Sequence, residues 1–298
     1  MAQPVTVILG LGREVGDAVA RRFSKFGHHV VAADPSDDRI AASRNAVPDE
    51  VLLHHGELHT RLGLRNALTV AVEAFGRVDN LIVIPDIEAA DSLEDFAQEK
   101  FDKAVAKATR GAALALKVFS ERISEQEDLP ESGVERIRQK GAVTFVLSYS
   151  AMATMPGRFT ETITQSAVLG VIKAGAVELA EQQIRVNGII AIRPREERIE
   201  SWTTRRTPLG RAAIADEIAD AARYLSSPEA AIVTGELLKL DGGRSSLPVS
   251  STRRRLPDRS VYHFPGLFRT QLPFQPYSLG SGCSTRCDTL RAPCPSTG

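Results

Sequence analysis

Short apolar runs of strand length alternate with longer stretches of helical period along most of this chain. The alternation opens with VTVIL at 5–9, a helical stretch at 13–27 and HVVAAD at 29–34. Further strand-length runs lie at 49–56, 80–84, 142–148, 185–192 and 235–243, and further helical stretches at 65–76, 93–124, 159–180 and 215–227. Because the runs are apolar at consecutive positions, both faces of each strand are expected to be buried, as in a parallel sheet covered by helices. The sequence therefore predicts an α/β fold.

The domain organisation follows from where the composition changes. The chain has 298 residues, of which 43% are hydrophobic, enough for one large domain. From residue 245 onward it has no Lys or Glu, seven of the sixteen prolines, and seven Arg against two acidic residues. Such a segment buries little apolar surface. We predict one domain over 1–244 and a disordered tail over 245–298, whose five aromatic residues leave a docking role open.

Charge and cysteine usage exclude several classes of protein. With 37 basic and 37 acidic residues, the net charge of zero gives no reason to expect a nucleic acid partner. No apolar run reaches the roughly 18 residues that a membrane span needs, and the first ten residues lack the basic start of a signal peptide. All three cysteines lie in the tail, and no His or Cys spacing fits a metal site. We expect a cytoplasmic protein without a metal ion.

A glycine-rich turn, in VTVILGLGREVGDAVARRF, joins the first expected strand to the first expected helix. A tight turn and a close approach to a pyrophosphate both favour residues without a Cβ, and the helix amino end attracts an anion. The spacing departs from G-x-G-x-x-G, because Val15 stands where the last glycine would be. The turn predicts a dinucleotide site or, alternatively, a plain β–α turn. The residues expected to bind the dinucleotide here are Gly10, Gly12, Arg13, Val15 and Gly16.

Asp34 ends the second strand, in VVAADP. A carboxylate at this place accepts hydrogen bonds from an adenosine ribose diol and repels a 2′-phosphate, which points to NAD. Arg13 in the glycine-rich turn would instead attract a 2′-phosphate, so NADP is not excluded. Two further alternatives stay open: Asp34 and Arg13 pair with each other, or Asp34 is a turn residue before Pro35.

At this point the chain resembles the short-chain dehydrogenase/reductase family over about residues 4–244. The strongest match is IRVNGI (184–189) followed by the run that begins TPLGRAAIADEIADAARYL and ends at LKLDGG (207–243). AFGRVDNLIV (74–83) matches the family's passage from a helix into a central strand. The resemblance implies one Rossmann-type domain with a doubly wound, seven-stranded parallel sheet. It also implies hydride transfer between a nicotinamide and a carbonyl or alcohol, in a dimer or tetramer.

The family's site residues carry over only in part. Its Thr-Gly-x-x-x-Gly-x-Gly falls on LGLGREVG, where Gly10 and Gly16 are retained and Leu9 and Glu14 depart from it. The acidic residue that holds the adenine falls on Glu57. Nothing remains of Asn-Asn-Ala-Gly at 83–86, and Ala108 stands where a helix Asn anchors a proton-relay water.

The catalytic residues depart further from the family pattern. The serine falls on Ser148, but the tyrosine falls on Glu161 and the lysine on Gln165. In the family the phenol exchanges a proton with the substrate oxygen, and the lysine lowers the phenol pKa and binds the ribose. An ionised carboxylate repels a developing alkoxide, and an amide brings no charge. We therefore expect a divergent member with a degenerate active site.

Three other residues are candidate substitutes or plain structural residues. Tyr149 follows Ser148 but should point to the opposite face of a strand. Lys173 lies two helical turns beyond Gln165, too far from the expected nicotinamide. For Ser148 itself the alternative to a catalytic role is a structural one, as a hydroxyl at the end of a strand. The specificity loop is expected at 191–207, without the family's Pro-Gly.

Two functions therefore compete at the level of sequence. One is an NAD(P)-dependent oxidoreductase with an impaired site, acting on a small carbonyl or alcohol. The other is a non-catalytic subunit, either dinucleotide-binding or purely structural, that keeps the fold and the dimer interface. Small residues along 167–176 suit close packing of the helix expected at 159–180 against a second helix.

Overall fold

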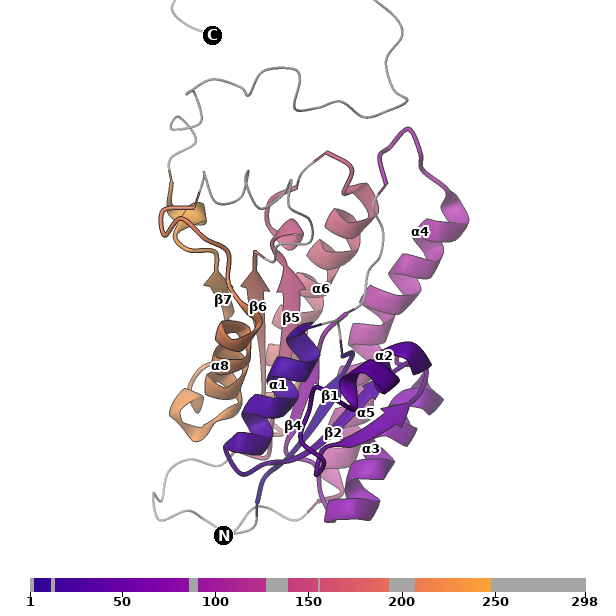
Figure 1. The fold of residues 1–298 in the computed structure, drawn as a ribbon, viewed down its shortest axis with the longest axis vertical. Coiled ribbons are helices and arrows are strands. Elements are labelled where there is room, and N and C mark those ends of the chain that lie inside the picture. Colours follow the sequence, from indigo (N-terminus) through magenta and orange to yellow (C-terminus); the bar gives the residue numbers. More distant parts are fainter. Residues whose placement is uncertain are drawn as a thin grey trace, which may run out of the picture. The chain divides into compact units, whose positions relative to one another are not determined.

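A computed structural model provides the structure, which describes residues 3–11, 14–85, 91–126, 139–154, 156–192 and 207–247 (Figure 1). Its centre is one sheet of seven strands, in the order β3-β2-β1-β4-β5-β6-β7. Every neighbouring pair is parallel. The strands are β1 (Val5–Leu9), β2 (His29–Asp34), β3 (Leu52–His55), β4 (Asn80–Val83), β5 (Gly141–Ser148), β6 (Ile184–Ala191) and β7 (Leu237–Leu240). The doubly wound α/β fold expected from the sequence is confirmed.

Helices cover both faces of this sheet (Figure 1). They are α1 (Glu14–Lys25), α2 (Asp37–Ser43), α3 (Arg61–Phe75), α4 (Gln98–Val105), α5 (Gly111–Ser124), α6 (Phe159–Glu178) and α8 (Ala215–Ser226). Short 3₁₀ segments are η2 (Tyr149–Ala151), η3 (Pro228–Ala230) and η4 (Arg244–Ser246). The strand order turns back between β1 and β4, so the carboxyl ends of these two strands form the switch point at which doubly wound sheets bind their ligands.

Alternating side chains of the strands feed two separate cores. In β1, Val5, Val7 and Leu9 belong to the core that contains the buried residues of α3, α5 and α6. Ile8 belongs to the other core, which contains the buried residues of α1 and α8. Because successive strand residues point to opposite faces, an apolar run fills both cores at once, as the sequence pattern predicted.

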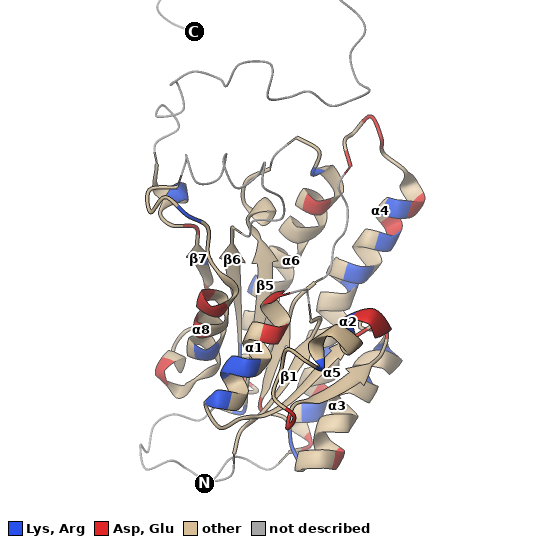
Figure 2. Ribbon diagram, viewed as in Figure 1, with Lys and Arg blue, Asp and Glu red and all other residues tan. Residues whose placement is uncertain are grey.

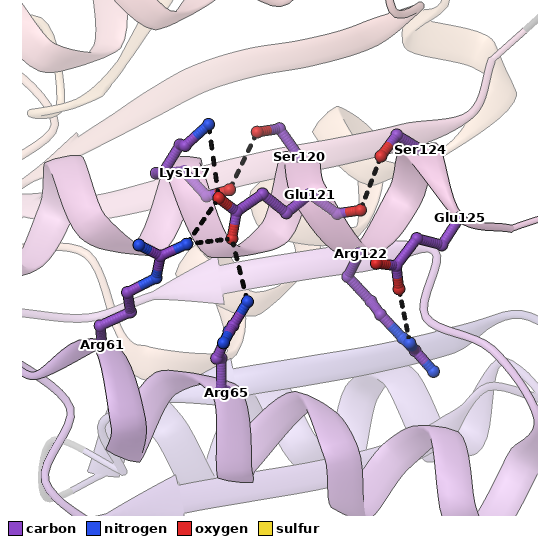
Figure 3. A network of polar contacts seen from close by, with 8 residues as sticks. All are labelled: Arg61, Arg65, Lys117, Ser120, Glu121, Arg122, Ser124 and Glu125. Atoms are coloured by element: carbon purple, nitrogen blue, oxygen red, sulfur yellow. Dashed lines mark hydrogen bonds and ion pairs between the residues drawn. The ribbon is translucent and has the colours of Figure 1, made fainter.

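Residues at the two ends of α3 determine where this helix begins and ends, and a charged contact holds it against α5. The Thr60 hydroxyl accepts from the N–H of Gly63 at the amino end, and Gly76 ends the helix with a left-handed φ of 80°. Glu121 of α5 lies 2.8 Å from Arg61 of α3 and 3.4 Å from Lys117, its own neighbour one turn away (Figure 3). The contact with Arg61 joins the two helices, and the contact with Lys117 lies within α5.

The expected helix over 93–124 differs from the observed one. The observed helical region begins at Gln98 and contains a π-helical segment, η1 (Ala106–Arg110), between α4 and α5. No residue of α4 is buried, whereas α5 packs its apolar side into the core. The helical period of the sequence continues through the segment, so the pattern gave no sign of the extra residue per turn.

Several expectations fall on residues that the structure does not describe. They concern most of the specificity loop expected at 191–207 and the tail beyond residue 247. Within the described part of the chain, no helix is long and apolar enough to cross a membrane.

Candidate active and cofactor site

The glycine-rich turn lies between β1 and α1, at the carboxyl end of the sheet. Gly10 has a φ of 94°, and a Cβ there would lie 2.3 Å from the Ile84 carbonyl oxygen. A Cβ on Gly16 would lie 2.1 Å from the carbonyl oxygen of Leu11, to which the Gly16 N–H donates at 2.8 Å. Both glycines are therefore required by backbone contacts. Gly12 lies outside the described residues.

The amino end of α1 faces this turn but carries negative charge. Val15 is 5% exposed, so its side chain belongs to the core and only its backbone is available to a ligand. Glu14 and Asp17 lie in the first turn of α1 and its basic residues in the last turn (Figure 2). Acidic groups stabilise a helix amino end, but they also offset the attraction of that end for a phosphate. Arg13 lies outside the described residues.

Asp34 is completely buried and holds three groups around its carboxylate. Its Oδ2 accepts from the N–H of Leu11 at 2.9 Å, and its Oδ1 accepts from the N–H of Ser36 at 2.9 Å. Arg39 Nη1 lies 3.5 Å from Oδ2. Asp34 thus joins the glycine-rich turn to the segment after β2. The cation found beside it in the described structure is Arg39.

Glu57 follows β3 and lies on the same edge of the sheet. Its carboxylate is 60% exposed and its Oε2 lies 3.1 Å from Nδ1 of His59. A Cβ on Gly63 would lie 2.0 Å from the Glu57 carbonyl oxygen, so the start of α3 packs closely on this segment. Gly10, Gly16, Asp34 and Glu57 therefore belong to one edge, formed by the ends of β1, β2 and β3.

Ser148 ends β5 and lies beside α6. Its backbone N–H donates to Oε1 of Gln165 at 3.2 Å, and Gln165 is 2% exposed. The hydroxyl of Ser148 donates to Oγ of Ser150 at 3.2 Å and accepts from the N–H of the same residue at 3.2 Å. The structure brings Ser148 and Gln165 together, and the amide side chain hydrogen-bonds the strand end.

Glu161 forms a buried ion pair near the amino end of α6. Nη1 of Arg158 lies 2.9 Å from Oε2 of Glu161, and the two side chains are 13% and 5% exposed. Positions 158, 161 and 165 are spaced i, i+3 and i+7, so their side chains share one face of the helix. The pair occupies the helix face on which Gln165 approaches Ser148.

Asp91 holds the amino end of α6, and no sequence motif marks it. Its carboxylate accepts from the N–H of Thr160 at 2.9 Å and from the Thr160 hydroxyl, and its carbonyl oxygen accepts from the N–H of Phe159 at 3.0 Å. Phe96 packs edge-on against Phe159, with ring centroids 6.0 Å apart. Asp91 and Thr160 are 69 residues apart in the chain, so no local pattern predicts their contact.

The possible substitutes for the missing groups lie elsewhere. Tyr149 belongs to η2, not to a strand, and its ring lies 5.5 Å from the Arg244 guanidinium. Burial raises the pKa of Tyr149. Lys173 is exposed, and its Nζ donates to the carbonyl oxygen of Gly235 at 3.4 Å. Ala108 is buried within η1 and offers a methyl group where the family has an amide.

No metal centre is visible in the described ranges, where no three His, Cys, Asp or Glu residues are grouped closely enough. His28 has a packing role. Its Nδ1 lies 2.9 Å from Oγ1 of Thr6, and burial lowers the pKa of His28 to about 4. It is therefore a neutral packing residue at neutral pH.

The family described as enoyl-(acyl carrier protein) reductase matches residues 10–245. Short-chain dehydrogenase reductase 3a of Arabidopsis thaliana is 27% identical over 256 residues, covering 81% of this chain and 95% of that protein.

Two solved structures share the fold. Levodione reductase is 26% identical with a TM-score of 0.72, covering 82% of this chain and 98% of the other. The 3-ketoacyl-(acyl-carrier-protein) reductase of Brucella melitensis, solved with NADH, is 27% identical with a TM-score of 0.70, covering 81% and 98%.

Proposed function

The chain belongs to the short-chain dehydrogenase/reductase family, and we propose that it is an NAD-binding member with a degenerate site for hydride transfer. Membership makes it an oxidoreductase of a family that uses nicotinamide dinucleotides. The buried ion pair of Arg158 and Glu161 is the observation that carries the proposal. In the family a tyrosine phenol supplies a proton to the substrate oxygen. A carboxylate already paired with a guanidinium cannot take over that role.

The cofactor end of the site supports dinucleotide binding. Gly10 and Gly16 let the turn pack closely on the backbone of Ile84 and Leu11, and α1 begins directly behind this turn. Asp34 stands where an acidic side chain favours NAD over NADP. The NADH complex of the Brucella relative adds support from a protein of the same fold. We assign the adenosine half to Gly10, Gly12, Arg13, Val15, Gly16, Asp34 and Glu57.

The reacting end of the site is weaker. NAD(H), when bound, supplies or accepts a hydride at its nicotinamide. Ser148 would orient the substrate oxygen, and Gln165 would offer a neutral amide to the nicotinamide ribose. Glu161 brings negative charge toward a developing alkoxide, although Arg158 offsets it. Loss of a positioned acid costs about 10²–10⁴ in rate, so we expect slow turnover of a small carbonyl or alcohol.

A non-catalytic role is the second candidate, and a specific observation favours it. Gln165 hydrogen-bonds Ser148, and Glu161 pairs with Arg158, so both residues have structural partners. Side chains with such partners are retained for stability without any turnover. Under this second hypothesis, the chain is a dinucleotide-binding subunit of a cytoplasmic dimer or tetramer that assembles through α6.

Binding and turnover of the full-length chain separate these readings. We expect calorimetric titration to give micromolar affinity for NADH, and a carbonyl panel to give turnover below about one hundredth of that of an intact relative. The triple variant Arg158→Ser/Glu161→Tyr/Gln165→Lys should gain activity, because it restores the phenol and the ammonium group. Arg158 is replaced as well, because its guanidinium would otherwise be left without its carboxylate partner. Fast wild-type turnover would refute the degenerate site, and no dinucleotide binding would refute the proposal as a whole.

A further inference from the structure

Arg244 is a cation beyond the carboxyl end of β7 that the proposed reaction does not use. It begins η4, and the buried Asp241 holds this turn from within. One carboxylate oxygen of Asp241 accepts from the N–H of Gly243 at 3.0 Å, and the other accepts from the N–H of Ser245 at 2.8 Å. Because both oxygens are engaged with the backbone, Asp241 fixes the turn that carries the Arg244 side chain.

The Arg244 guanidinium lies against Tyr149, the residue that directly follows Ser148. Its Cζ lies 5.5 Å from the centroid of the phenol ring, within the range of a cation–π contact. Burial raises the pKa of Tyr149; the charge of Arg244 and a hydrogen bond from it lower that pKa, and the charge of Asp241 raises it. The pKa is raised overall, so the phenol keeps its proton at neutral pH. Since the phenol oxygen accepts from the guanidinium, its O–H can donate to a further acceptor.

The contact of Tyr149 with Arg244 joins the end of β5 to the end of β7, at the same edge of the sheet as Ser148 (Figure 1). The segment that follows the expected specificity loop packs at the end of β7 as well, where the N–H of Leu209 donates to the carbonyl oxygen of Gly242 at 3.1 Å. The contact is therefore flanked by the residue assigned to the substrate oxygen and by the segment expected to select the substrate.

We propose that Arg244 and Tyr149 bind a carboxylate of the substrate, so that the site takes oxo acids or the matching hydroxy acids in preference to uncharged compounds. This inference rests on the proposed dinucleotide-dependent function. A guanidinium and a phenol can both donate to one carboxylate, and hydrogen bonds to ionised groups are the stronger kind. The nearby Glu161 adds no net negative charge, because it is paired with Arg158.

Three variants separate charge, geometry and the phenol. Arg244→Gln removes the cation, and Arg244→Lys keeps the charge without the planar pair of donors. Tyr149→Phe removes the phenol O–H and keeps a ring for the guanidinium to lie on. The matched control is Arg65→Gln on α3, which removes an arginine whose side chain is 58% exposed.

The experiment is calorimetric titration of 4-oxopentanoate, 5-oxohexanoate and the methyl ester of each into the full-length chain saturated with NAD⁺. NAD⁺ cannot reduce a carbonyl, so these complexes do not react and the Kd reports binding alone. The two chain lengths place the carboxylate at two separations from the carbonyl. We expect one of the acids to bind the wild type about tenfold more tightly than its ester.

That preference for the acid should disappear in Arg244→Gln and fall about threefold in Arg244→Lys and in Tyr149→Phe. It should be unchanged in Arg65→Gln, and the affinity for the esters should stay within about threefold in every variant. Because Arg244→Lys keeps the charge on the turn, it tests the site even if Arg244→Gln does not fold.

The outcomes distinguish this inference from the proposed function. Equal affinity for acids and esters in a chain that binds NAD⁺ would overturn the carboxylate site and leave dinucleotide binding intact. An equal loss of acid and ester affinity in Arg244→Gln would also overturn it, because Arg244 would then only support the turn. If the wild type did not bind NAD⁺, the proposed function and the inference would fail together.

Discussion

The contact between Arg158 and Glu161 has an asymmetry that single substitutions should reveal. Arg158→Met leaves the Glu161 carboxylate, 5% exposed, buried without its cation. Glu161→Gln leaves a guanidinium that is 13% exposed and closer to water. We expect the first change to lower the free energy of unfolding by about 3 kcal/mol and the second by about half as much.

Urea denaturation measures both values, with Arg110→Met on the exposed surface of η1 as the control for loss of an arginine. Equal losses below about 0.5 kcal/mol in both variants would mean that the pair behaves as a solvated surface contact.

Asp17 should make stability depend on pH in an unusual direction for a carboxyl group. Burial raises the pKa of Asp17 above its usual value of 3.8, so the folded state holds this proton more tightly than the unfolded state. Stability then falls as pH rises from about 3.8 through the raised pKa of the folded state, and the penalty remains above it. We expect Asp17→Asn to be more stable than the wild type at pH 7.

The advantage of Asp17→Asn should vanish below a pH of about 3.8, where both states of the wild type are protonated. Urea unfolding at several pH values gives the comparison, with the exposed Asp49→Asn as its control. A variant that is less stable than the wild type at pH 7 would show that the ionised carboxylate stabilises the fold.

At the scale of elements, the start of α6 depends on a distant acceptor. The cap residue Arg158 makes no side-chain capping hydrogen bond, and Asp91 accepts from the Thr160 N–H instead. Asp91→Ala should therefore destabilise the protein by about 1–2 kcal/mol, the usual cost of losing a helix cap. Amide exchange should accelerate in the first turn of α6 and stay unchanged in α5.

Hydrogen exchange read by mass spectrometry checks this, with Asp95→Ala in the same segment as control, because Asp95 contacts Ser92 and not α6. Equal protection of α6 in Asp91→Ala and the wild type would show that Asp91 does not hold the helix.

The elements that could be predicted are those whose signal is local. The apolar runs and Gly76 mark strands and a helix end through burial and φ, which neighbouring residues determine. The π-helical segment at Ala106–Arg110 could not be predicted, because its helical period continues on both sides. At the site, Ser148 and Gln165 could be placed by family register. The contact of Asp91 with Thr160 could not, since it depends on the fold bringing distant segments together.

At the scale of the whole molecule, α6 leaves one side that no other described part of the chain covers. Its exposed residues include Ile163, Ala167, Gly170, Ala174 and Val177, with Val177 76% exposed. Their spacing places small and apolar groups along one stripe of the helix. We proposed assembly through this helix, and the stripe is where a second copy would bury apolar surface.

Gly170 offers a test of assembly that leaves the subunit intact. A Cβ at this position meets no atom within 4 Å, so a larger side chain fits the isolated subunit without a clash. Glycine inside a helix also costs about 1 kcal/mol relative to better helix formers, so replacing it should not weaken the fold.

Gly170→Glu should therefore place a charge in the proposed interface and convert a dimer or tetramer to a smaller species. Gly170→Ala should keep the wild-type assembly. Sedimentation velocity with matched unfolding curves would decide the matter: a wild-type mass unchanged in Gly170→Glu would place the interface on another face.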